Sequence, residues 1–326
     1  MNVTGKWPHR VLIATLALGG AAAYQRVAEA RDARRNSPPG NLFDVGGYRL
    51  HAVIAGEGNT TVVFLSGLGG TCLEWYGIQR EIARETRTIS YDRGSLGWSD
   101  RRPGRSTSCA IAQELRALLY AAGIAPPYVL VGQSFGGVHA RVFADQYPDE
   151  VAGMVLVDAS HEDQAPFWER RPRLTRIRET VSWRIYVLNP LLARLGILRL
   201  RGMSVELFEY LSAEVRRQAK ALALRSRAFD GGLAEYRAVT ESDRQVRAAR
   251  ALGDMPLIVL TALWRSPQRG FASEHQFNAF WMELQSQLAA LSSNSIHVVA
   301  NTDEHFMQHG EPELVVDAIR LALTLA

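Results

Sequence analysis

Cysteine is scarce in this sequence of 326 residues, and its only two cysteines, Cys72 and Cys109, lie far apart. Disulfide-stapled scaffolds and zinc sites with paired cysteines need closely spaced thiols, so neither class fits this chain. The two thiols could form a disulfide only if the fold brings them together. The sequence predicts no bound metal and no organic cofactor.

The sequence also lacks a strong excess of charge of one sign. Its 37 basic and 33 acidic residues give a formal net charge of +4. This excess is too small and too scattered to indicate binding of nucleic acid. Hydrophobic residues make up 47% and charged residues 21% of the chain, as in ordinary globular proteins, which excludes wholesale disorder.

No apolar run clearly reaches the roughly 20 residues that span a membrane. The nearest candidate is Val11 to Tyr24, which follows basic residues and precedes the small-residue sequence Ala28-Glu29-Ala30. Residues 1–30 are therefore predicted to be a signal peptide or a single membrane anchor, with residues 11–28 contacting the membrane. We accordingly expect a secreted or membrane-associated protein, and interpret residues 31–40, RDARRNSPPG, as a polar linker.

Residues 41–160 and 255–326 are predicted to form the two parts of one α/β core. Short apolar runs alternate there with helical patterns, which is typical of a mainly parallel sheet with helices on both faces. Between them, residues 161–254 lack strand patterns and contain amphipathic helical stretches, which predicts a helical lid inserted into the core. The expected strands are 42–45, 48–54, 61–65, 87–91, 128–131, 151–157, 256–260 and 296–300.

The motif VLVGQSFGG at residues 129–137 indicates a catalytic serine. Its G-x-S-x-G pattern places Ser134 in a tight turn between a buried strand and a helix, where the serine oxygen is exposed at the carboxyl end of the strand. The alternative is a glycine-rich connection with an incidental serine. The apolar strand before the motif and the amphipathic helix after it favour a nucleophile.

Two further loops follow strand ends at the same edge of the predicted sheet. The glycine-rich loop after residue 65 and the start of the helix after the serine supply the backbone amides of Leu68 and Phe135, which are predicted to form an oxyanion hole. His305 follows the last strand and is predicted to be the general base. His309 is the competing histidine, disfavoured because it lies farther from the strand end.

Together these residues resemble the α/β-hydrolase fold superfamily, in particular its lidded branch of bacterial esterases, cofactor-free haloperoxidases, haloalkane dehalogenases and epoxide hydrolases. The resemblance covers residues 41–326 apart from the lid. It rests on the glycine loop with Trp75 downstream, YDRGSLGWSD at 91–100, the elbow GQSFGG, and HFMQHGEPE at 305–313. It implies an α/β-hydrolase fold, Ser134 as nucleophile, His305 as base, and Leu68 and Phe135 as oxyanion-hole donors.

Three departures from the family pattern matter. Ser66 stands where many members carry a histidine before the oxyanion-hole glycine. A serine nucleophile argues against the chemistry of dehalogenases and epoxide hydrolases, which use aspartate. Arg265 occupies the usual acidic position after the seventh strand, so the acid of the triad must come from elsewhere.

Asp158, after the sixth strand, is predicted to be this acid. Asp92 is expected to hold the loop that it begins, and Asp303 lies too close in sequence to His305 to reach its ring easily. Asp158 gives the chain order serine, acid, histidine, and some lidded relatives carry their acid at this strand. If Asp158 only caps the loop into the lid, the nearby substitutes are Glu162 and Asp163.

The sequence thus predicts a serine hydrolase that cleaves a carboxylic ester or related acyl bond of a small, apolar substrate through an acyl-enzyme. One alternative is a cofactor-free perhydrolase or haloperoxidase, or a carbon–carbon hydrolase, with the same triad. Another is a catalytically silent receptor or interaction protein on the same fold. The intact Ser134 and His305 argue against a silent protein.

Overall fold

In the computed structural model, the structure describes residues 7–165, 169–170, 176, 180–202, 211–263 and 272–326. The chain divides into two compact units. One contains residues 39–177 and 231–326, and we call it the core unit. The other contains residues 1–38 and 178–230, and we call it the helical unit.

The core unit is built on a mainly parallel sheet, as predicted. Its described strands follow the order β1-β2-β4-β3-β5-β6-β7-β8, in which β2 is antiparallel to both neighbours and the remaining pairs are parallel. The strands are β1 (Asn41–Asp44), β2 (Arg49–Ala55), β3 (Thr61–Leu65), β4 (Arg87–Tyr91), β5 (Tyr128–Gln133), β6 (Val151–Val157), β7 (Leu257–Thr261) and β8 (Ser295–Val299).

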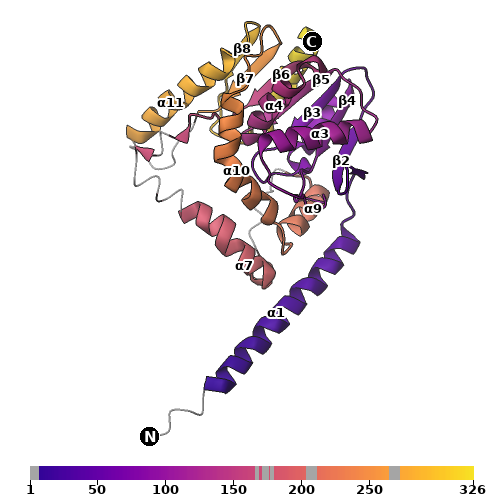
Figure 1. Ribbon diagram of the computed structural model, residues 1–326, viewed down its shortest axis with the longest axis vertical. Helices are drawn as coiled ribbons and strands as arrows, with labels where there is room; N and C mark the ends of the chain where they lie inside the picture. The colour runs from indigo at the N-terminus through magenta and orange to yellow at the C-terminus, as the bar shows by residue number, and fades with distance from the viewer. Residues whose placement is uncertain (1–6, 166–168, 171–175, 177–179, 203–210, 264–271) are drawn as a thin grey trace. The chain divides into compact units, whose positions relative to one another are not determined.

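Helices cover both faces of this sheet, whose strands β3, β5 and β7 are buried at every position. In β3, Val63 and Leu65 belong to one buried cluster, and Val62 and Phe64 belong to another. Alternate residues of a strand point to opposite faces, so each cluster fills one face. Figure 1 shows α3 and α4 over the first face.

The described helices of the core unit are η1 (Cys72–Trp75), α2 (Tyr76–Ile82), α3 (Ser108–Ala121), α4 (Phe135–Gln146), η2 (Pro148–Glu150), α10 (Asp230–Arg247), α11 (Ala272–Ala289), α12 (Met307–Gly310) and α13 (Pro312–Leu325).

The helical unit joins the amino-terminal segment to the inserted helices. It contains α1 (Trp7–Arg35), η3 (Arg184–Leu188), α7 (Asn189–Arg194), α8 (Ile197–Leu200) and α9 (Ala213–Ala223). The buried Gln25 donates through Nε2 to Leu224 O at 2.7 Å, and Arg199 Nη1 lies 2.6 Å from Asp32 Oδ2. The carboxyl-terminal half of α1 is thus part of the packing of this unit.

Two predicted domain boundaries fall inside elements of the structure and stay predictions. Residues 31–35 of the predicted linker are helical, because α1 runs through alanine, glutamate and arginine, which favour helix, before the prolines at 38 and 39 stop it. The predicted lid, 161–254, includes α10, which belongs to the core unit. α10 buries Glu235 in an ion pair with Arg93 and adds Val246 to a core cluster. The function of the other inserted helices as a lid stays a prediction.

The amino-terminal half of α1 exposes apolar side chains, with Leu12 at 56%, Leu16 at 67% and Leu18 at 53% exposed. Even so, within the described part of the chain no helix combines the length and the apolar character needed to cross a bilayer. A membrane-spanning helix is therefore not supported there. The signal-peptide alternative stays a prediction.

Candidate active site

Ser134 lies at a sharp turn between β5 and α4. Its φ of +52° is rare for a residue with a side chain, and its backbone is held by Ser134 N–H donating to Val157 O at 3.1 Å. A Cβ added to Gly136 would lie only 2.2 Å from Leu65 O, so the start of α4 can approach β3 this closely only with glycine there. This strained strand-to-helix turn is the geometry of a nucleophile elbow.

Asp158 and His305 form a short hydrogen bond at the carboxyl ends of β6 and β8. His305 Nδ1 lies 2.6 Å from Asp158 Oδ2, and the carboxylate is buried while the imidazole is about half exposed. With an ionised Asp158, this contact places a proton on Nδ1 and leaves Nε2 available as a base. The catalytic functions of the two residues stay predictions. Gln133 Nε2 also donates to His305 O at 3.2 Å, which ties the histidine loop to the residue before Ser134.

The other oxygen of Asp158 accepts two hydrogen bonds that the sequence did not indicate. Trp281 Nε1 donates to Oδ1 at 2.8 Å, and Ala262 N donates to it at 3.1 Å. Trp281 lies in α11, where a tryptophan is indistinguishable by pattern from any core residue. Both carboxylate oxygens are thus engaged, which fixes the orientation of the carboxylate toward His305.

The competing acids have other partners. Glu162 accepts two hydrogen bonds from Arg141, at 2.6 and 2.9 Å, and Asp163 pairs with Arg247 at 2.6 Å. The Glu162 pKa is held at about 2: burial acts to raise it, but the hydrogen bonds and charge of Arg141 outweigh this effect. Arg265, which the sequence analysis placed at the usual acid position, lies outside the described residues.

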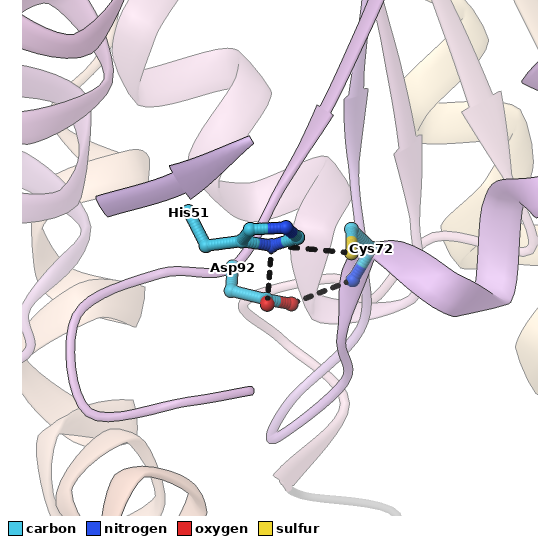
Figure 2. Close-up of side chains that lie close together, drawn as sticks. All are labelled: His51, Cys72 and Asp92. Carbon is cyan, nitrogen blue, oxygen red and sulfur yellow. Dashed lines mark hydrogen bonds and ion pairs between the residues drawn. The ribbon is translucent and has the colours of Figure 1, made fainter. Parts of the chain in front are cut away.

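Asp92 forms a buried cluster with His51 and Cys72 (Figure 2). Asp92 Oδ2 lies 2.9 Å from His51 Nδ1, and Asp92 Oδ1 accepts from Cys72 N at 2.9 Å. His51 Nε2 accepts a hydrogen bond from Gly40 N at 3.3 Å, so the ring proton lies on Nδ1 and points to Asp92. Nδ1 then has no lone pair for a metal. The cluster fixes loops, and both Cys72 and Cys109 are free thiols rather than a disulfide.

The predicted oxyanion-hole loop is a tight turn beside Ser134. Gly70 N donates to Gly67 O at 2.9 Å, and Gly69 has a φ of +72°, as position three of a type II turn requires. A Cβ on Gly67 would lie 3.2 Å from Ser134 Cβ. Ser66, the departure from the family pattern, donates through Oγ to Thr71 O at 2.9 Å, so this side chain closes the loop.

The amides of Leu68 and Phe135 are the two predicted donors. Leu68 is the second residue of this turn, and among the described residues no hydrogen bond engages its N–H. Phe135 is the first residue of α4, and the first N–H groups of a helix have no partner within that helix. Neither amide has a hydrogen-bond partner among the described residues, and their function as an oxyanion hole stays a prediction.

Glu74 places a shielded carboxyl group against the same turn. A Cβ on Gly70 would lie 2.5 Å from Glu74 Oε2, an oxygen that accepts no hydrogen bond from any described residue. Burial raises the pKa of Glu74 to about 7, although the charge of Arg93 acts to lower it. Glu74 therefore titrates near neutral pH next to the turn.

Replacing this carboxyl group should change how stability depends on pH. Because the folded pKa of Glu74 is raised to about 7 from an ordinary 4.5, its contribution to stability is complete below pH 4.5 and is lost as pH rises through 7. Glu74→Gln stays neutral, so we expect it to match the wild type below pH 4 and to exceed it by about 3 kcal/mol at pH 8. Thermal unfolding across this range measures the difference. Parallel curves for the two proteins would contradict the raised pKa.

Comparison with known proteins agrees with this architecture. The family model for the alpha/beta hydrolase fold matches residues 60–176. The chain is 28% identical over 264 residues to the uncharacterized protein YqjL of Bacillus subtilis, which covers 81% of this chain and 83% of that protein. A thermophilic esterase from Thermogutta terrifontis has a TM-score of 0.58 and 22% identity, over 85% of this chain and 93% of the esterase. An epoxide hydrolase from Bacillus megaterium has a TM-score of 0.62 and 15% identity, over 87% and 100%.

These matches and the sheet order agree on one fold. The chain has the α/β-hydrolase fold, and residues 60–176 match the family model of that fold. The fold and the family model support a hydrolase.

Proposed function

We propose that this protein is a serine hydrolase that cleaves a carboxylic ester or a related acyl bond through an acyl-enzyme on Ser134. The observation that carries the proposal is the 2.6 Å hydrogen bond between His305 Nδ1 and Asp158 Oδ2, formed beside the elbow that presents Ser134. A histidine held in this way can accept the serine proton at Nε2, and a serine in place of aspartate favours acyl transfer.

The proposed reaction has two half-reactions. Ser134 Oγ attacks the carbonyl carbon while its proton moves to His305 Nε2, and the negative oxygen that forms is bound by the amides of Leu68 and Phe135. The C–O bond then breaks, and His305 gives its proton to the leaving alcohol. In the second half, His305 takes a proton from water as the water oxygen attacks the acyl carbon. The bond between this carbon and Ser134 Oγ then breaks, His305 returns the proton to Oγ, and the acid product leaves. Asp158 stabilises the imidazolium in both halves.

We further propose a small substrate with an apolar acyl group. Phe306 supports this choice, because its ring is 38% exposed and lies 5.6 Å from the ring of His305. Apolar surface next to the base favours an acyl chain over a charged group. A series of p-nitrophenyl esters of increasing chain length would measure this preference.

A fluorophosphonate probe tests the proposed nucleophile directly. We expect stoichiometric labelling, with the modified peptide containing Ser134, together with hydrolysis of p-nitrophenyl acetate or butyrate. A peroxide-dependent halogenation assay, run in parallel, tests the perhydrolase alternative. An intact, folded protein that neither labels nor hydrolyses any ester would instead support the silent interaction protein.

We also propose that the amino-terminal segment of α1 associates with a lipid surface. The exposed Leu12, Leu16 and Leu18 follow basic residues in the sequence, and this combination favours binding to anionic lipid interfaces. The opposite end of α1 is anchored within the helical unit by Gln25 and Asp32. The helix thus has one packed half and one exposed apolar half.

Two truncations separate these halves. Deleting residues 1–20 should abolish co-sedimentation with phosphatidylglycerol vesicles while leaving thermal unfolding and ester hydrolysis unchanged. Deleting residues 1–30 also removes Gln25 and Glu29, which bond Leu224 O and Ser226 N, and leaving such groups unpaired costs about 1–3 kcal/mol each. The longer deletion should therefore unfold at lower temperature. Vesicle binding that survives the shorter deletion would refute the lipid contact, and equal unfolding temperatures would refute the anchoring.

A further inference from the structure

Arg93 is a charged residue buried beneath the predicted oxyanion-hole turn. Its side chain is 1% exposed and pairs with Glu235, with Nε at 2.6 Å from Oε1 and Nη2 at 3.0 Å from Oε2. The same guanidinium donates to two carbonyls at the start of the turn, Ser66 O at 2.8 Å and Gly67 O at 2.7 Å. Nε, Nη1 and Nη2 of Arg93 thus all donate hydrogen bonds, either to Glu235 or to the backbone of Ser66 and Gly67.

Glu235 completes the arrangement from the other side. Its Oε2 accepts a hydrogen bond from Gly69 N at 2.8 Å, and its side chain is 2% exposed. The ion pair thus fixes backbone groups on both sides of Leu68: the carbonyls before it and the amide after it. The Leu68 N–H is the turn amide that remains without a partner among the described residues.

The helix that carries Glu235 packs directly on these loops. A Cβ on Gly231, in the first turn of α10, would lie 2.7 Å from Ser95 O, and a Cβ on Gly69 would lie 3.4 Å from Gly232 Cα. Backbone contact this close leaves little room for the turn to shift. Glu235 thus lies on a helix that is packed closely against these loops, and this packing fixes the position of its carboxylate.

Stability alone does not account for this ion pair. A buried pair must overcome the desolvation of both charges, and well-packed apolar side chains of similar volume are often as stable or more so. What an apolar pair cannot do is bind Ser66 O, Gly67 O and Gly69 N. We propose that Arg93 and Glu235 are positioning residues that aim the Leu68 amide at the oxyanion formed on Ser134. This inference rests on the proposed function.

The expected changes in kcat and KM follow from the state of the reaction that the Leu68 amide stabilises. An oxyanion-hole donor binds the negative oxygen of the transition state more strongly than the neutral carbonyl, and loss of one donor lowers kcat by about 10²–10³. A donor that is misaligned rather than absent should lower kcat by about 10- to 100-fold. KM should stay within about twofold, because the interaction belongs to the transition state.

Two variants and one control test the proposal. Glu235→Gln removes the charge that holds Arg93. Because Oε2 accepts from both Gly69 N and Arg93 Nη2, the amide carbonyl keeps that position and the NH₂ group faces Arg93 Nε as a second donor. The double variant Arg93→Met with Glu235→Leu refills the space without an unpaired charge, and so protects the fold if the single variant unfolds. The control is Glu114→Gln in α3, which breaks the buried pair with Arg102, 2.8 Å long. Glu114 also accepts hydrogen bonds from Gly94 N and Tyr48 Oη, and none of these contacts is with the turn.

The readouts are kcat and KM for a short p-nitrophenyl ester, and inhibition by a trifluoromethyl ketone and by the matching secondary alcohol. The ketone forms a negative hemiketal on the serine and needs the oxyanion hole, whereas the alcohol does not. Active enzyme is counted with the fluorophosphonate probe. For the Glu235 single and the double variants we expect kcat to fall 10- to 100-fold and the ketone to bind at least tenfold more weakly, with KM and alcohol inhibition unchanged. Glu114→Gln should lose thermal stability but keep all four values.

Folded variants with wild-type kcat and ketone affinity would overturn the proposal. So would equal losses of kcat in Glu114→Gln and in the double variant, because the effect would then be general destabilisation. A wild-type protein that neither labels at Ser134 nor hydrolyses esters would refute the proposed function itself. That outcome is distinct from an active wild type whose turn variants are unimpaired.

Discussion

Ester hydrolysis by the Ser134→Ala variant is expected to fall by about 10⁵ to 10⁶ relative to the wild type. Alanine cannot form the acyl-enzyme, and the remaining turn amides can only stabilise attack by water. The remaining activity should still exceed the rate of the uncatalysed reaction by a factor of about 10³–10⁴. The variant should also lose all labelling by the fluorophosphonate probe, because no other oxygen is proposed to be activated.

The fold should be unchanged in this variant. Both serine and alanine carry a Cβ, so the φ of +52° at position 134 is equally strained in the two proteins. Ser160→Ala is the matched control, since only the backbone N–H of Ser160 contacts Ser134 O, at 2.9 Å. Wild-type turnover in Ser134→Ala, or a comparable loss in Ser160→Ala, would remove Ser134 from the mechanism.

Asp158→Asn should lower turnover by about 10⁴ while preserving the fold. The structure explains why the amide must be harmful. Trp281 Nε1 and Ala262 N both donate to Oδ1, so the carbonyl of asparagine must take that position. Its NH₂ group then faces His305 Nδ1, which forces the ring proton onto Nε2. In this tautomer the imidazole cannot accept the proton of Ser134.

Two controls make the result specific. Asp163→Asn changes a nearby acid whose partner is the half-exposed Arg247, and it should stay within about twofold of wild-type turnover. Trp281→Phe removes one donor to Asp158 Oδ1 and leaves Oδ2 free to hold His305, so its loss should be far smaller than that of Asp158→Asn. An Asp158→Asn enzyme with near-normal turnover would mean that another acid orients the histidine.

Most of the sheet could be predicted because its strands are unusually simple in sequence. β3, β6 and β7 are continuous apolar runs, and only a strand buried on both faces needs such a run. The turn after β5 could be predicted as well, because only glycine at position 136 allows the start of α4 to lie this close to β3. The antiparallel pairing of β1 and β2 followed from the glycine turn between them.

The contacts that hold Asp158 and the predicted oxyanion-hole turn in place could not be predicted in the same way. Amphipathic periodicity is identical for a lid helix and a core helix, so α10 was assigned to the lid although Glu235 pairs with Arg93 over 142 positions of sequence. The same holds for Trp281, which contacts an acid 123 positions away. Residues 31–35 are predicted as linker for a different reason: their charges are typical of an exposed connection, whereas the partners of Gln25 and Asp32 in the inserted helices lie far away in sequence.

The left-handed backbone at Ser134 and Asp158 has a consequence for the evolution of this chain. Among the described residues, these two and Ser95 are the non-glycine residues with positive φ. Glycine would relieve such strain, which amounts to about 1–2 kcal/mol at each position. Selection for stability alone would therefore favour glycine at Ser134, one of the three members of the proposed triad. At Asp158 the loss of the hydrogen bonds from Trp281 and Ala262 would offset the gain. The sequence that folds most tightly is thus an inactive one, and the stability margin of the natural chain is reduced by the requirements of turnover.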